Sequence, residues 1–177
     1  MIQTGPLHKH DSGAKINFLS IGLGILPVAR YFTDMNVPNL RGCYEQVGNL
    51  YHFARMLDKI RLHAAGKLPA DYTANLGGGF DGRICALLSV KYDDVVARLK
   101  QGGSDEDVLQ WCYTAGRKPT DNEIELTNEF MRKRGWNDAA SDRLADRVKE
   151  LGPQWVGKIH TFFDLIEADE GRSPRCR

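Results

Sequence analysis

A chain of 177 residues is long enough for one domain with a buried core and too short to predict two. Hydrophobic residues make up 42% and charged residues 27%, as in ordinary globular proteins. The 24 basic and 23 acidic side chains nearly cancel, so no overall field favours nucleic acid or an anionic membrane surface. Only a local patch could serve such a partner.

The cysteines and the longest apolar run indicate the cellular compartment of the protein. The four cysteines are far apart and form no CxxC pair, which argues against structural zinc. Residues 16–29 are apolar but shorter than the about 20 residues of a membrane span. Asp11 interrupts the basic region before this run and no clear cleavage site follows, so a signal peptide is disfavoured. We expect a cytoplasmic protein with reduced cysteines.

The composition changes near residue 36. Residues 1–36 scatter Gly and Pro through an apolar stretch without helical periodicity, which predicts an extension that is disordered or an artefact of the assigned start. In the second case translation begins at Met35. Residues 37–172 are predicted to form one helical domain, and residues 173–177 a flexible tail.

The first three helices are predicted from apolar spacing. Apolar residues recur at intervals of three and four between Phe53 and Ala64, and Gly66 ends that helix. Residues 67–80 are expected to form a loop. A second helix begins near Asp81, and a third is capped by Asp93.

Capping patterns mark the later helices. Ser104 with Asp107, and Thr120 with Glu123, have the spacing of capping boxes. A sixth helix starts at Asn137 or Asp138, and a seventh runs over about 154–166. Since no long period-two alternation occurs, the prediction is an all-α single domain of about seven short helices. Glycines are expected to close their turns: Gly66, Gly102, Gly116, Gly135, Gly152 and Gly171.

Several segments resemble an uncharacterised bacterial family that is known only as a domain of unknown function. The matching stretches are residues 54–63 (ARMLDKIRLH), 75–83 (NLGGGFDGR), 107–112 (DVLQWC), 130–136 (FMRKRGW) and 161–171 (TFFDLIEADEG). They occur in order and together span about residues 37–172. The resemblance implies a compact bacterial domain and supplies no catalytic residues.

The glycine loop is one candidate anion site. Residues 77–82 match GxGxxG, but no buried strand precedes them, so a dinucleotide fold is rejected. Gly78 and Gly79 before a helix start, together with Arg83, suit a phosphate or a carboxylate. Alternatively, Asp81 caps the helix and the glycines only permit close packing.

The helix over 53–64 carries the densest polar cluster. Arg55, Lys59 and His63 share one stripe, and Asp58 is predicted to bridge Arg55 and Arg61. Such a stripe is consistent with anion binding and proton transfer, or with a solvated helix face.

Two further segments allow a functional or a structural interpretation. Arg132, Lys133 and Arg134 beside Trp136 suit RNA, but cations are also favoured at a helix C-terminus. Cys112 and Cys85 lie among apolar residues, and core packing is expected for both.

The last helix carries an acidic end that opposes the helix dipole. We expect salt bridges to offset Asp164, Glu167, Asp169 and Glu170, through the cluster at 55–61 or through Arg132 and Arg134. The alternative is a divalent metal on Asp164 and Glu167, which are three residues apart.

Together these features predict a binding or accessory module without a cofactor. Its polar groove would hold an anionic small molecule or a protein partner through Arg55, Lys59, His63, Gly78, Gly79 and Arg83. The alternative is an enzyme in which His63 is the general acid or base, Asp58 orients a neighbour, and Arg55 or Arg83 binds the substrate. RNA binding through residues 132–136 is the third hypothesis. The sequence leaves the oligomeric state open.

Overall fold

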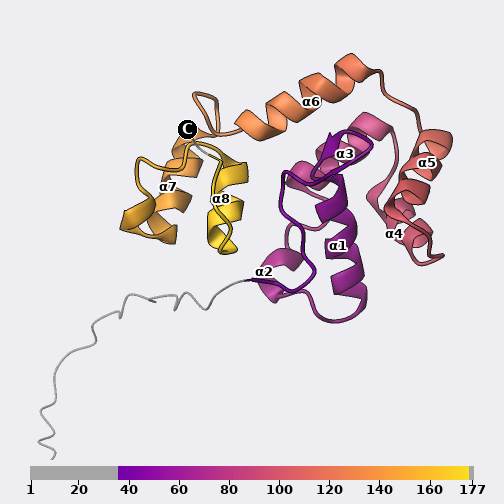
Figure 1. Cartoon of the computed structure of the whole chain (residues 1–177), viewed down its shortest axis with the longest axis horizontal. Coiled ribbons are helices and arrows are strands. Elements are labelled where there is room, and N and C mark those ends of the chain that lie inside the picture. The colour runs from indigo at the N-terminus through magenta and orange to yellow at the C-terminus, as the bar shows by residue number, and fades with distance from the viewer. Residues whose placement is uncertain (1–35, 176–177) are drawn as a thin grey trace, which may run out of the picture. The chain divides into compact units, whose positions relative to one another are not determined.

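A computed structural model describes residues 36–175 of the chain. The predicted extension 1–36 and the proposed start at Met35 therefore lie, apart from Asn36, outside the described residues. The described part contains eight α-helices, one 3-10 helix and one two-stranded sheet (Figure 1). In chain order these are β1 (Gln46–Val47), β2 (Leu50–Tyr51), α1 (Phe53–Ala64), α2 (Ala70–Thr73), α3 (Gly79–Leu88), α4 (Tyr92–Leu99), α5 (Asp105–Ala115), α6 (Asp121–Lys133), α7 (Ser141–Leu151), η1 (Pro153–Trp155) and α8 (Phe162–Asp169).

The predominantly helical prediction is confirmed, with two additions. The seven expected helices correspond to α1 and α3–α8, and the loop expected over 67–80 also contains α2. The second addition is the hairpin of β1 and β2, which pair antiparallel. Gly48 and Asn49 turn it with φ values of 55° and 65°, as a type I′ turn requires. Strands of two residues are too short to show an alternating pattern.

Capping chemistry placed two helix starts correctly. Both side-chain bonds of the capping box are present at α5 and again at α6. Three other predicted starts were wrong. Helix α4 begins at Tyr92 without a side-chain cap, so Asp93 lies inside its first turn. Helix α7 begins at Ser141, because the carboxylate of Asp138 accepts from the backbone N–H groups of Gly135 and Ala140 instead.

The third wrong start, that of α8, changes where the acidic residues lie relative to the helix dipole. Helix α8 begins at Phe162 and not near 154, because Gly152 and Pro153 lead into η1 and an extended Val156. Asp164 therefore lies in the first turn of α8, where the Thr161 hydroxyl caps it and negative charge is favoured. Only the later acids face the unfavourable end of the helix dipole.

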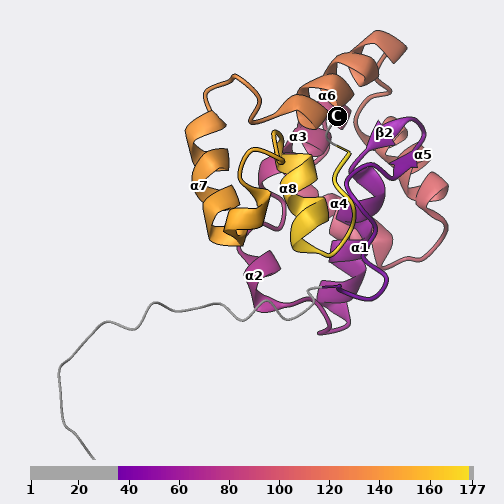
Figure 2. The ribbon, with the colours of Figure 1, turned by 60° about the vertical axis from the view of Figure 1, so that its left-hand side comes forward.

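Helix α1 is the centre of the larger core. Every residue from Phe53 to Ile60 is buried, since α3 and α4, the hairpin, the segment just before it and part of α8 pack around α1. Figure 2 shows α1 behind α8 and beside α4. A second, smaller core joins α7 to α8 through Leu144, Val148 and Leu165. A helix enclosed on all sides must pair its charged residues internally.

The chain continues to contact the domain beyond α8. The backbone N–H of Arg175 donates to Asp164 at 2.8 Å, and its guanidinium lies 4.3 Å from the ring centroid of Tyr44. Residues 173–175 of the tail expected at 173–177 thus include one anchored position, and residues 176–177 lie outside the described range.

Candidate functional site

The polar cluster of α1 is placed in the interior and not on a solvated face. Arg55 and Lys59 are only 3% and 7% exposed, whereas His63, one turn further on, is exposed. Asp58 does not bridge Arg55; its carboxylate binds Arg41 at 2.7 Å and Arg61 at 3.3 Å. The residues predicted to share one stripe are therefore separated, since Arg55 and Lys59 lie in the core and His63 lies at the surface.

Arg55 is neutralised by the end of α8. Its guanidinium makes two hydrogen bonds with Glu170, one of them at 2.9 Å, and donates to the Arg41 carbonyl at 2.8 Å. Glu170 also accepts from Tyr72 at 2.8 Å and from Arg172. Burial opposes ionisation of Glu170, but Arg55 and Arg172 outweigh it and hold its pKa below the usual range. The salt-bridge explanation of the acidic end is thereby confirmed for Glu170.

A buried cluster of His52, Lys59 and Asp81 lies between α1 and α3. Lys59 Nζ is 2.7 Å from both carboxylate oxygens of Asp81, which is fully buried. His52 Nε2 lies 3.0 Å from Asp81 Oδ1, and the backbone N–H of Gly77 donates to Oδ2. Asp81 therefore does not cap α3, as the alternative interpretation of the glycine loop required. The negative charge of Asp81 instead pairs with the Lys59 ammonium group in the interior of the protein.

The electrostatics of this cluster give His52 a neutral ring. Burial lowers the pKa of His52 to about 4, although the bond to Asp81 acts in the opposite direction. Burial also opposes ionisation of Asp81, but His52 and Lys59 outweigh it and lower its pKa. We therefore assign the proton to Nε2, which donates to Asp81. Nδ1 is then a buried acceptor without a partner among the described residues.

This cluster resembles the base and orienting acid of a catalytic triad, but its surroundings are those of a core. The ring of His52 stacks on Phe163 and tilts against Phe80, and His52 is 2% exposed. The neighbouring thiol of Cys43 is held protonated, because burial raises its pKa to about 12. His52 lines neither of the two clefts described below, and its buried, packed ring supports a structural role for the cluster.

Among the described residues, His63, Asp58 and Arg83 of the predicted enzyme site make no hydrogen bond or ion pair with one another. His63 is exposed near the C-terminal end of α1, Asp58 is occupied by two arginines, and Arg83 extends over α6. Neither of the two clefts described below is lined by any of these three residues.

The glycine loop and Arg83 remain at the surface. Gly78 and Gly79 are exposed, and α3 begins at Gly79 without a side-chain cap. Arg83, one turn further along, is also exposed, with its guanidinium 4.4 Å from the ring centroid of Phe130 on α6. Arg134 approaches the same ring to 5.6 Å. Of the predicted anion-binding residues, these three are accessible, together with His63.

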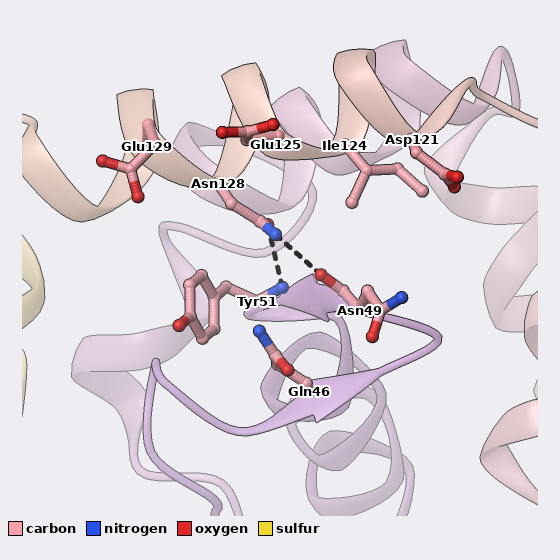
Figure 3. Close-up of a pocket in the computed structure, with 8 residues that line it drawn as sticks. All are labelled: Gln46, Asn49, Tyr51, Asp121, Ile124, Glu125, Asn128 and Glu129. Carbon is pink, nitrogen blue, oxygen red and sulfur yellow. Dashed lines mark hydrogen bonds between the residues drawn. The ribbon is translucent and has the colours of Figure 1, made fainter.

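A cleft of about 320 Å³ lies between the hairpin and α6 (Figure 3). Asn128, which is 9% exposed, ties its two walls together. Its side chain accepts from the Tyr51 N–H at 3.1 Å and donates to the Asn49 carbonyl at 2.6 Å. Apart from Ile124, the remaining lining is polar and carries three carboxylates at helical spacing: Gln46, Asp121, Glu125 and Glu129. This chemistry suits a cation and opposes an anion.

The cations expected to contact RNA are paired within their own segment. Arg132 and Lys133 each lie 2.7 Å from Glu129, and Arg134 lies 2.6 Å from Asp138. Trp136 is 57% exposed. Because most of the local charge is neutralised, little is left for phosphates.

The two metal candidates are occupied by donors. Asp164 accepts from the hydroxyls of Tyr44 and Thr161. Glu167 accepts from the Cys43 N–H at 2.6 Å and from Arg172 at 2.6 Å. Within residues 36–175, no group of three or more His, Cys, Asp or Glu side chains is arranged to hold a metal ion.

Sequence reasoning missed His52, Arg41 and Asn128. His52 adopts φ 64° at the N-cap of α1, where a side-chain cap was not expected and no helical spacing applies. Arg41 precedes the first helix and pairs with Asp58 and Asp105 across 17 and 64 residues. Separations of this length leave no local signal in a single sequence.

The core positions of the thiols agree with the sequence analysis. Cys85 and Cys112 are buried among apolar side chains, and burial raises their pKa values to about 12 and about 11. No helix in the described residues is both long and apolar enough to cross a membrane.

Comparison with known proteins agrees with the resemblance seen in the sequence. The profile of a domain of unknown function, DUF5069, matches residues 37–172, which include every described helix. Among curated proteins, none matches the chain. The chain therefore belongs to the DUF5069 family of domains of unknown function.

Proposed function

We propose that this domain is a non-catalytic binding module that docks a carboxylate-bearing protein partner on one face of α3 and α6. The docking surface, called here the Arg83 surface, consists of Arg83, Leu126, Phe130 and Arg134. The observation that carries the proposal is Arg83 itself. Its guanidinium is exposed, is held over Phe130, and makes no salt bridge with any residue in 36–175.

The apolar part of the surface supports a protein partner. Leu126, Phe130 and Arg134 follow one another at intervals of four along α6 and just beyond it, so they share one stripe. Leu126 is 62% exposed and Phe130 is 42% exposed, which is unusual for large apolar side chains. Exposed aromatic and arginine side chains are enriched among the residues that dominate protein–protein binding.

A small anionic metabolite is a weaker match for this surface. Small molecules are held mainly in concave sites, and Arg83 lines neither the cleft beside the hairpin nor the one beside α7. Two cations of α1 that the sequence assigned to such a ligand form internal ion pairs instead: Arg55 pairs with Glu170, and Lys59 pairs with Asp81. A folded protein partner fits this surface better, because it can bind a flat face that combines cationic and apolar side chains.

We place the protein in a bacterial cytoplasm: the sequence resemblance implies a bacterial domain, and the cysteines favour the cytoplasm. Cys43, Cys85 and Cys112 are buried and unbridged, which supports a reducing compartment. Localisation of the tagged protein in its native host checks this part separately.

The test is an NMR titration with two synthetic probes, Ac-Asp-Glu-Phe-Asp-Glu-NH₂ and the uncharged Ac-Asn-Gln-Phe-Asn-Gln-NH₂. We expect the acidic probe to shift the amide signals of Arg83, Leu126 and Phe130. Arg83→Gln should weaken its binding about fivefold, the upper end of the range for an exposed ion pair.

Arg143→Gln is the matched control, because Arg143 is also exposed and lies 4.9 Å from an aromatic ring, that of Phe162. Equal binding of the two probes, or an equal loss with the control variant, would overturn the proposal.

A further inference from the structure

A second surface lies between α7 and the segment that follows η1, and it is a groove with an apolar floor. The groove encloses about 280 Å³. Leu144, Val148 and Ile159 line it and are only 4–5% exposed. Trp136 and Val156 line it as well, but each is 57% exposed. Large apolar side chains exposed beside an apolar floor are typical of a surface that another molecule covers.

The ionisable side chains that line this groove are basic. Lys149 and His160 line it, and no carboxylate does. Lys149 pairs at 3.1 Å with Asp146, but both side chains are about 70% exposed (68% and 71%), so solvent screens the pair. His160 makes neither a hydrogen bond nor an ion pair with any residue that the structure describes. The groove therefore presents the Lys149 ammonium and the His160 imidazole to an incoming group, whereas the cleft of Figure 3 presents carboxylates.

We infer that this groove docks a partner-protein segment in which one or two large apolar side chains are followed by a carboxylate. The apolar side chains cover the floor between α7 and Ile159, and the carboxylate meets Lys149 and His160. The size of the groove supports a peptide side chain, because small-molecule sites usually enclose about 300–1,000 Å³ and bury most of the ligand. The complementarity is thus apolar at the floor and electrostatic at the rim.

This inference is independent of the Arg83 surface. The two surfaces share no residue, and each can be disabled by a substitution that leaves the other in place. One partner could contact both, but neither inference needs the other.

The test is a titration of the whole chain with Ac-Leu-Leu-Asp-NH₂, followed through the indole N–H signal of Trp136 and the amide signal of Val156. Ac-Leu-Leu-Asn-NH₂ and Ac-Leu-Leu-Lys-NH₂ are the matched probes. We expect the Asp probe to shift both signals and to bind at least about fivefold more tightly than the Asn probe, with the Lys probe weakest. Lys149→Glu should reverse that order. Lys158→Glu, at an exposed position that does not line the groove, should preserve it.

Three results would overturn the inference. The first is equal binding of the Asp and Asn probes, and the second is no shift of Trp136 at millimolar peptide. The third is a shift of Trp136 on raising the protein concentration alone, which would make a second copy the occupant. Because the spectra also report folding, a misfolded variant is recognised directly. Failure here leaves the Arg83 surface untouched, since Arg83→Gln tests that surface with other probes.

Discussion

Replacing Asp81 by Asn removes a charge that the core uses to hold Lys59. The amide oxygen can still accept the hydrogen bond from His52, but the amide NH₂ cannot accept from the Gly77 N–H, so the change removes the charge together with this 3.3 Å bond. Lys59 Nζ lies 2.7 Å from both Asp81 oxygens, and the two side chains are 8% and 0% exposed. Breaking a buried pair by removing one partner costs about 3–5 kcal/mol, because the other charge remains unsolvated.

An upper limit on this cost follows from proton loss. A buried ammonium without a partner can deprotonate, and from the ordinary lysine pKa of about 10.4 this costs about 4.6 kcal/mol at pH 7 and about 2 kcal/mol at pH 9. We therefore expect Asp81→Asn to lower the free energy of unfolding by about 3–4 kcal/mol at pH 7. The loss should shrink at pH 9, since the neutral amine then becomes accessible.

Urea denaturation at both pH values measures this effect, and a second substitution controls for packing. Adding Lys59→Met removes the unpaired charge and should recover at least half of the lost stability, because apolar replacements of buried ion pairs are often neutral. The reasoning is refuted if Asp81→Asn costs less than about 1 kcal/mol at pH 7, or if the double variant is no more stable than the single one.

Two other consequences can be measured by the same denaturation assay. Because the pKa of His52 is lowered from 6.5 to about 4, the unfolded chain binds the proton first, and stability should fall as the pH drops from 6.5 to 4. The full loss of unfolding free energy is about 3 kcal/mol, at about 1.4 kcal/mol per pKa unit. His52→Asn should flatten the dependence of stability on pH in this range. An unchanged slope in the variant would contradict the prediction. A Cβ at Gly116 would lie 2.1 Å from the Leu88 carbonyl oxygen, whereas one at Gly66 would meet nothing within 4 Å. Gly116→Ala should therefore cost more than Gly66→Ala, whose penalty is limited to its φ of 65° and is about 1 kcal/mol; the reverse order would be inconsistent with this close approach.

Local chemistry explains which parts of the fold were predictable. Ser104 and Thr120 accept from backbone N–H groups three residues later, so their helix starts depend only on neighbours in sequence. The start of α8 was misplaced, because a Gly-Pro pair after α7 forms η1 and not the first turn of a longer helix. The hairpin was not predicted, because strands of two residues each are too short to show an alternating pattern.

The candidate site was less predictable than the fold. The sequence suggested Arg83 as a charge beside the glycine loop, but it gave no sign of Phe130, which lies 47 positions later and whose ring packs against the guanidinium. Lys59 was placed on a solvated face because its spacing with Arg55 fits a helix stripe. Nothing local reveals that Asp81 approaches from another helix.

The sequence by itself determined the helical class, seven of the eight α-helices of the described residues and the caps of α5 and α6, because periodicity and capping act within one or two turns of the chain. Only the tertiary structure decided which charges reach solvent. Arg55 pairs with Glu170 across 115 residues, and the same packing leaves Arg83 exposed over α6. Burying α1 on all sides requires each of its core charges to find a carboxylate or a cation, and those partners come from distant segments.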